Sequence, residues 1–265
     1  MKKQLFYMTS FIAVCLIVYV YYQFYNLDGF QNVVSTNAMI IVEPRMEPRL
    51  KAVIKNFDDI MDSSWDLYLF YGKSYINYAQ ASTREIVKRK VILIQLEVNN
   101  MSSSEYNFLF KQKQFWDNIN AENILVFQTD AILCKKSNFK IKDFINYSYI
   151  GCSYDNKIIG KNNVIWETED LSFYGVGGLS FRKKSFMIDC IENFPQIRST
   201  IPEDVFFSQC LTKSPNRPPN AITLNNFCTQ YNYIGNSFGA HKTNIDLKNK
   251  DIFYQYCPEA KILEI

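Results

Sequence analysis

Apolar residues occur in short continuous runs that alternate with stretches in which they recur every three or four positions. Continuous runs are typical of strands buried on both faces, and the wider spacing is typical of amphipathic helices. In the first half of the chain this pattern predicts strands over 39–42, 65–71, 91–96 and 124–127, with helices over 50–61 and 106–119. Strands that alternate with helices indicate an α/β domain with a mainly parallel sheet flanked by helices.

The second half is less regular. It contains two short predicted strands, over 147–152 and 177–181, and two predicted helices, over 186–194 and 205–211. Beyond Lys213 several prolines and few periodic runs predict mainly loops. We therefore expect one domain with a nucleotide-binding type of first half and an irregular second half.

The N-terminus has a different pattern. The 21 residues from Leu5 to Tyr25 lack charge and are almost wholly apolar or aromatic; as a helix they would span about 31 Å, the thickness of a bilayer core. Lys2 and Lys3 precede this stretch and Asp28 follows it, so the positive-inside rule predicts a type II, single-pass anchor with the body in the lumen or outside the cell. A cleaved signal peptide and a buried helix of a soluble protein are the alternatives.

These features divide the chain into 1–27 (cytosolic tip and transmembrane signal-anchor), 28–37 (short stem) and 38–265 (the folded domain). Basic and acidic residues number 29 and 26, and without a basic surplus a nucleic-acid partner is not expected. Six of the seven cysteines are scattered over the body without a C-x-x-C pair. A lumenal body could hold one or two disulfides of unknown pairing. Two N-x-S triplets, at Asn100 and Asn146, agree with a lumenal glycoprotein.

Candidate site residues follow two of the predicted strands. Glu43 and Arg45 end the first strand, and Gln128 and Asp130 end the fourth. In open α/β sheets ligands bind outside the carboxyl ends of the strands, where an Asp can reach a metal or a ribose. The simpler alternatives are that Asp130 only begins a turn and that Arg45 only forms a salt bridge.

The second half adds five candidates. Gly177 and Gly178 open a predicted strand, where glycine is unfavourable unless something approaches the backbone closely, although a bulge would also explain them. Glu203 and Asp204 begin a helix; paired carboxylates suit a general base, and they also suit the helix dipole. His241 is the single histidine of the chain, and a lone histidine is usually a bystander. P-loop, G-x-G-x-x-G and G-x-S-x-G motifs are absent from the sequence.

In order along the chain, the segments V-E-P-R, F-Q-T-D, G-G-x-S-x-R, E-D-V and G-x-H-K form a series. This series resembles a family from giant viruses, algae and fungi that is related to metal-dependent glycosyltransferases of the GT-A type. The resemblance extends from about Ile40 to Lys242. It implies a GT-A-like fold, a nucleotide-sugar donor, a glycan or protein acceptor, and Mn²⁺ or Mg²⁺ as cofactor.

The resemblance also implies roles for individual residues. Asp130 matches the metal-binding Asp of the GT-A Asp-x-Asp motif, with Gln128 in place of the first Asp, and His241 matches a late metal ligand. Asp204, or else Glu203, matches the carboxylate that deprotonates the acceptor. The strand of Gly177 and Gly178 is similar to the segment that lines the donor-sugar pocket, although Val176 replaces the usual Asn.

From these residues and the resemblance we expect a glycosyltransferase of hexosyltransferase type that works by an inverting mechanism. Glu43 and Arg45 are expected to line or brace the nucleotide pocket. One alternative is a membrane-anchored, catalytically inactive GT-A-like protein that binds glycans or acts as a scaffold. A metal-dependent phosphoesterase would need more carboxylate or histidine ligands than the sequence offers.

Overall fold

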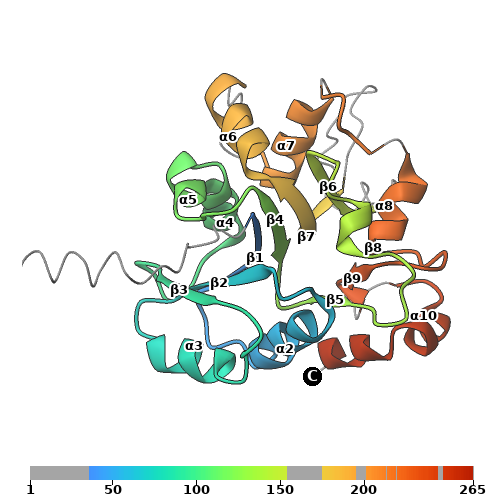
Figure 1. The fold of residues 1–265 in the computed structure, drawn as a ribbon, viewed down its shortest axis with the longest axis horizontal. Coiled ribbons are helices and arrows are strands. Elements are labelled where there is room, and N and C mark those ends of the chain that lie inside the picture. Colours follow the sequence, from blue (N-terminus) through green and yellow to red (C-terminus); the bar gives the residue numbers. More distant parts are fainter. Residues whose placement is uncertain are drawn as a thin grey trace, which may run out of the picture. The chain divides into compact units, whose positions relative to one another are not determined.

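The computed structural model describes residues 36–153, 175–194, 201–212, 214–218, 220–243 and 247–264. Within them the centre of the fold is a six-stranded sheet with the order β3-β2-β1-β4-β7-β6 (Figure 1). Its strands, in chain order, are β1 (Asn37–Glu43), β2 (Trp65–Tyr71), β3 (Val91–Gln95), β4 (Asn123–Phe127), β6 (Tyr149–Cys152) and β7 (Val176–Lys183). A smaller sheet has the order β5-β9-β8, formed by β5 (Ala131–Leu133), β8 (Cys228–Thr229) and β9 (Gly239–His241).

Helices connect and cover these strands. The α-helices are α2 (Leu50–Ile60), α3 (Ile76–Thr83), α4 (Ser103–Phe110), α5 (Lys113–Asp117), α6 (Lys184–Asn193), α7 (Glu203–Leu211), α8 (Ala221–Phe227) and α10 (Lys250–Tyr256). The 3₁₀ helices are η1 (Ile141–Asp143) and η3 (Pro258–Glu264).

The strand order contains a switch point. β1 pairs in parallel with β2 on one side and with β4 on the other, and β2 pairs in parallel with β3. The chain therefore leaves β1 toward one edge of the sheet and later returns to its other side, which opens a crevice at the carboxyl ends of β1 and β4. β7 runs antiparallel to β4, so the beginning of β7 lies at this same edge.

Each face of the sheet has its own core, because alternate side chains of a strand point to opposite faces. Met39 and Ile41 of β1 belong to one buried cluster together with Phe57 of α2, whose ring stacks on Phe127 at 3.9 Å between centroids. Ile40 of β1 belongs to the other cluster, with Trp116 of α5 and Phe207 of α7 among its members. The sheet is thus the middle of three layers.

The predicted parallel α/β architecture is confirmed. The strand predicted over 65–71 has those bounds, and the other predicted strands differ from the observed ones by a few residues at their ends. The helix predicted over 106–119 is instead two short helices, α4 and α5. The indole Nε1 of Trp116 donates to the Phe110 carbonyl at 2.8 Å, an acceptor that a continuous helix would offer to the amide four residues later.

The prediction of mainly loops beyond Lys213 is wrong in part, because α8, β8, β9, α10 and η3 lie in this region. β5 and β9 were also not predicted. Each of these strands has three residues, which is too short to show a period. They form through long-range pairing of Ala131 with His241 and of Leu133 with Gly239.

Six cysteines form three nested disulfides. Cys134–Cys257 encloses Cys152–Cys228, which in turn encloses Cys190–Cys210. The sequence led us to expect one or two bridges, and the structure has three. Disulfides in this number are typical of proteins that fold in an oxidising compartment.

The predicted transmembrane segment, Leu5–Tyr25, lies outside the described residues. Among the residues that the structure does describe, none of the helices has the length and apolar character needed to cross a bilayer.

We predict that the disulfides form where the full-length chain is made. Of seven cysteines in the chain, only Cys15 lies outside the three bridges. The protein, purified from a eukaryotic host and denatured with a maleimide present from lysis onward, should carry one maleimide label before reduction and seven after reduction and relabelling, as read by mass spectrometry. Seven labels before reduction would contradict the disulfides.

Candidate active site

A cavity of about 480 Å³ opens at the carboxyl ends of β1 and β4. Its volume suits a small-molecule ligand. All nine residues that the sequence singled out line this one cavity: Glu43, Arg45, Gln128, Asp130, Gly177, Gly178, Glu203, Asp204 and His241. The fold brings together positions up to about 200 residues apart, because β1, β4 and the beginning of β7 meet at the switch point.

Glu43 anchors the wall formed by the end of β1. Its carboxylate is buried and forms a two-pronged ion pair with Arg45, whose Nε and Nη2 lie 2.8 and 2.9 Å from the two oxygens. The backbone amide of Arg45 also donates to Glu43, and Thr129 donates from the β4 side at 3.5 Å. Arg45 therefore both lines the cavity and forms the salt bridge, with its side chain half exposed.

Asp130 and His241 face each other in the cavity. The pairing of β5 with β9 aligns Ala131 with His241, and the Lys242 amide donates to the Asp130 carbonyl at 3.0 Å. This backbone register places Asp130 Oδ1 3.1 Å from His241 Nε2. Both atoms are buried, and neither has a hydrogen-bond partner.

The other ring nitrogen decides what Nε2 can do. His241 Nδ1 lies 2.9 Å from Oε1 of the buried Gln230. A carbonyl oxygen only accepts, so Nδ1 carries the hydrogen, and in the neutral form of the ring Nε2 presents a lone pair. A second group that orients the ring in this way is typical of metal-binding histidines. Two acceptor atoms then face each other at close range, which is unfavourable without a cation between them.

These two residues fit a divalent cation. Two ligands at right angles around a cation with bonds of about 2.1 Å lie about 3.0 Å apart, close to the observed 3.1 Å. Within the described ranges no group of three His, Cys, Asp or Glu side chains forms a metal site, so further ligands would have to come from a bound substrate and water.

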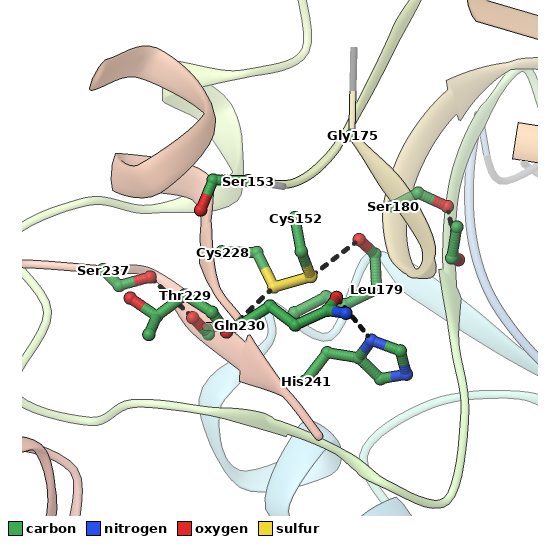
Figure 2. The surroundings of a disulfide bond; sticks show 12 residues. Cys152, Ser153, Gly175, Leu179, Ser180, Cys228, Thr229, Gln230, Ser237 and His241 are labelled. Carbon is green, nitrogen blue, oxygen red and sulfur yellow. Dashed lines mark hydrogen bonds between the residues drawn. A yellow bond between two sulfur atoms is a disulfide. The ribbon is translucent and has the colours of Figure 1, made fainter. Parts of the chain in front are cut away.

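Gln230 was not singled out from the sequence, where no pattern distinguishes it. Figure 2 shows its side chain reaching from the neighbourhood of the Cys152–Cys228 disulfide to the His241 ring. Cys228 lies in β8 two residues before Gln230, and the bridge joins it to the end of β6. The disulfide thus tethers β8, and Gln230, the residue directly after this strand, contacts the histidine.

The two glycines are explained by their neighbours. A Cβ at Gly178 would collide with the His241 ring, and a Cβ at Gly177 would collide with the Glu203 carboxylate. Gly178 is also hydrogen-bonded to the end of β4, because its backbone carbonyl accepts from the backbone N–H of Gln128 at 2.9 Å. The glycines therefore let both functional side chains approach the same short stretch of backbone.

Glu203 and Asp204 have different surroundings at the beginning of α7. Both oxygens of Glu203 accept from the guanidinium of Arg182, at 2.6 and 2.9 Å, and both side chains are buried. Asp204 is half-buried and accepts the Gly177 amide at Oδ2 (3.2 Å) and the Val205 amide at Oδ1 (2.8 Å). Each oxygen of either carboxylate accepts one donor and keeps a lone pair. Glu203, however, is buried in an ion pair with Arg182, whereas Asp204 is half-buried and lacks a cationic partner among the bonds above, so Asp204 is the better placed of the two to take a proton from a ligand.

The pKa of Asp204 is raised to about 6, because burial and the nearby Glu203 charge outweigh the two amide donors. A base with this pKa is mostly ionised at neutral pH and holds a proton more strongly than an ordinary aspartate. Its surroundings therefore suit general base chemistry.

Other residues of the cavity wall were not predicted. Arg49 and Lys242 add positive charge, and Ser102, Tyr106 and Asn107 come from the beginning of α4. Ser102 and Glu105 form a capping box, so the S-x-x-E pattern at 102–105 could have located this helix start in the sequence.

Comparisons with known proteins assign the chain to a family. A family model described as "Protein of unknown function (DUF5672)" matches residues 90–243. No curated protein matches the chain. Among solved structures, mouse xyloside xylosyltransferase 1 in its apo form is similar at 8% sequence identity, with a TM-score of 0.48, over 80% of this chain and 99% of that chain.

The raised pKa of Asp204 predicts a pH effect on stability. Between about pH 4 and 6 the folded protein keeps the Asp204 proton that the unfolded chain has lost, so the free energy of unfolding falls as the pH rises through this window. Asp204→Asn removes this loss. In urea unfolding, the free energy of unfolding of Asp204→Asn minus that of the parent should therefore increase by on the order of 1–3 kcal/mol from pH 4 to pH 7, which means that the variant gains stability relative to the parent. A constant difference would contradict the raised pKa.

Proposed function

The chain belongs to the family described as "Protein of unknown function (DUF5672)", and from the geometry of its cavity we propose that it is a metal-dependent, inverting glycosyltransferase of GT-A type. The donor is a nucleotide sugar, and the acceptor is a hydroxyl group of a glycan or protein. The proposal rests on one observation: the unpartnered pair Asp130 Oδ1 and His241 Nε2 lines the same cavity as the Asp204 carboxylate. A cation site and a base in one cavity suit transfer from a diphosphate to a hydroxyl.

The position of the cavity supports this proposal. It lies at the switch point between β1 and β4, the place where open α/β sheets bind nucleotides. Glu43, Arg45 and Gln128 form the wall at this switch point and are proposed to contact the nucleotide. Gly177 and Gly178, which leave the beginning of β7 without side chains, are proposed to line the donor-sugar pocket.

Asp130 and His241 would hold Mn²⁺ or Mg²⁺, with diphosphate oxygens and water as the remaining ligands. When bound there, the cation would neutralise the negative charge that develops on the departing nucleoside diphosphate. Gln230 keeps the Nε2 lone pair of His241 directed at this position. Gln128 replaces the first Asp of an Asp-x-Asp motif, so its neutral amide is proposed to contact the nucleotide rather than the cation.

Asp204 is proposed as the general base. Its carboxylate takes the proton of the acceptor hydroxyl while the hydroxyl oxygen attacks the anomeric carbon. One C–O bond to the acceptor forms, the C–O bond to the diphosphate breaks, and the diphosphate leaves with the electron pair. Attack on the face opposite the leaving group inverts the configuration. Glu203 is less suited to this step, because its carboxylate is buried in a two-pronged ion pair with Arg182.

We further propose that the body faces an oxidising compartment behind an N-terminal anchor. Three disulfides in the described residues support this, as does the uncharged stretch Leu5–Tyr25 after two lysines. The alkylation pattern given above tests the compartment directly.

The metal site predicts unequal effects of two substitutions. Asp130→Ala should abolish Mn²⁺-dependent binding of a nucleoside diphosphate, because it removes the charged ligand. His241→Ala should weaken binding less, about 10–100-fold, because water can take the vacant position. Binding is measured by calorimetry with Mn²⁺ and UDP or GDP, with Glu97→Ala on the exposed surface outside the cavity as control. Parent-like binding by both cavity variants would rule out this site.

The base predicts a loss of rate without a loss of donor binding. Asp204→Asn is nearly isosteric, and it should lower the transfer rate about 10²–10⁴-fold at saturating donor while the donor dissociation constant stays close to that of the parent. The rate is measured with a panel of nucleotide sugars and acceptors. A parent that binds donor and glycan but never turns over would favour the glycan-binding or scaffold alternative instead.

A further inference from the structure

Arg182 is a charged residue enclosed in the core. Its side chain has no exposed surface. The guanidinium carbon lies between 5.0 and 6.0 Å from the ring centroids of Phe110, Tyr149, Phe207 and Trp116. Burying a charge among aromatic rings is costly unless its hydrogen bonds are satisfied.

Two of its three hydrogen-bond partners, Glu203 and Gly177, line the cavity, and the third is the buried Ser180. Nη1 and Nη2 donate to the two oxygens of Glu203, Nε donates to the Ser180 hydroxyl at 2.9 Å, and Nη2 also reaches the Gly177 carbonyl at 3.4 Å. A buried ion pair of this kind contributes little net stability, and apolar residues of similar volume often replace one without loss. Stability alone therefore does not account for the pair.

The pair connects to Asp204 by two routes. Ser180 Oγ donates to the Gly177 carbonyl at 2.9 Å. Gly177 is thus held on its carbonyl side, while its backbone N–H on the other side of the Cα donates to Asp204 Oδ2. On the other side, Glu203 precedes Asp204 in the first turn of α7, and Arg182 ties that turn to β7. One guanidinium thus holds both the backbone amide that binds Asp204 and the helix turn that carries it.

We propose that Arg182 and Glu203 are a positioning pair, which fixes the Asp204 carboxylate at the cavity in the orientation that proton transfer needs. The inference rests on the proposed function of Asp204 as general base. The pair also affects the proton affinity of the base. The Glu203 charge raises the pKa of Asp204 more than the Arg182 charge lowers it, so the pair as a whole makes Asp204 the stronger base.

The double variant Arg182→Met/Glu203→Leu tests this pair, because it removes both charges and keeps the volume. It should fold with a melting temperature near that of the parent and bind the donor with a KM within about threefold. Its kcat should fall at least tenfold, and the acid limb of its pH–rate profile should move to lower pH. The matched control is Asp58→Leu/Arg89→Met, a second ion pair with the same burial that lies outside the cavity wall. Arg89 also donates to four backbone carbonyls, so this control should lower stability and leave kcat unchanged.

Ser180→Ala is a milder variant in case the double variant does not fold. It removes the hydroxyl between Arg182 and Gly177, and its kcat should fall several-fold with the donor KM unchanged. If the double variant, or Ser180→Ala in its place, keeps the parental kcat and pH profile while Asp204→Asn is inactive, the positioning role is wrong and the proposed function stands.

If Asp204→Asn is as active as the parent, the proposed base itself is wrong. If the parent protein shows no measurable sugar transfer, the pH titration of the Asp204 carboxyl ¹³C signal in NMR spectra replaces the rate measurement. Its titration midpoint should lie near pH 6 in the parent and lower in the double variant. The same midpoint in the double variant and the parent would contradict the proposed effect of the pair on Asp204.

Discussion

The close approach of side chains to Gly177 and Gly178 is the constraint on which the rest of the site depends. His241 packs against one glycine and Glu203 against the other, at distances that a Cβ would forbid. The Gly178 carbonyl is bonded to Gln128 at the end of β4, and the Gly177 amide is bonded to Asp204. A two-residue stretch of bare backbone therefore joins the proposed cation site to the proposed base.

Much of this arrangement could be predicted from the sequence. The buried strands over 39–42 and 124–127 are continuous apolar runs, so their burial on both faces and their parallel pairing followed from pattern alone. Glu43 and Asp130 were candidates because they follow such strands, and the switch point brings their positions together. The glycine pair was informative because it opened a strand, and its close neighbours are now identified as His241 and Glu203.

The remainder depends on contacts between distant residues, which leave no local pattern. β5 forms through pairing with β9 across more than 100 residues, and β9 pairs in addition with β8. At the break between α4 and α5, the Trp116 indole takes the Phe110 carbonyl that a continuous helix would offer to a backbone amide. Gln230 and Arg182 are ordinary residues in the sequence, and their importance comes from the atoms that they meet, His241 in one case and Glu203 in the other. The pairing of six scattered cysteines was equally undetermined.

The central claim is that Asp130 and His241 hold a divalent cation beside a bound nucleoside diphosphate. The most direct measurement is a crystal structure of the protein with Mn²⁺ and UDP or GDP, with data collected near the manganese absorption edge. The account predicts an anomalous peak about 2.1–2.3 Å from both Asp130 Oδ1 and His241 Nε2, in contact with diphosphate oxygens. A bound nucleotide with no peak between these two atoms, or with the manganese held elsewhere in the cavity, would contradict it.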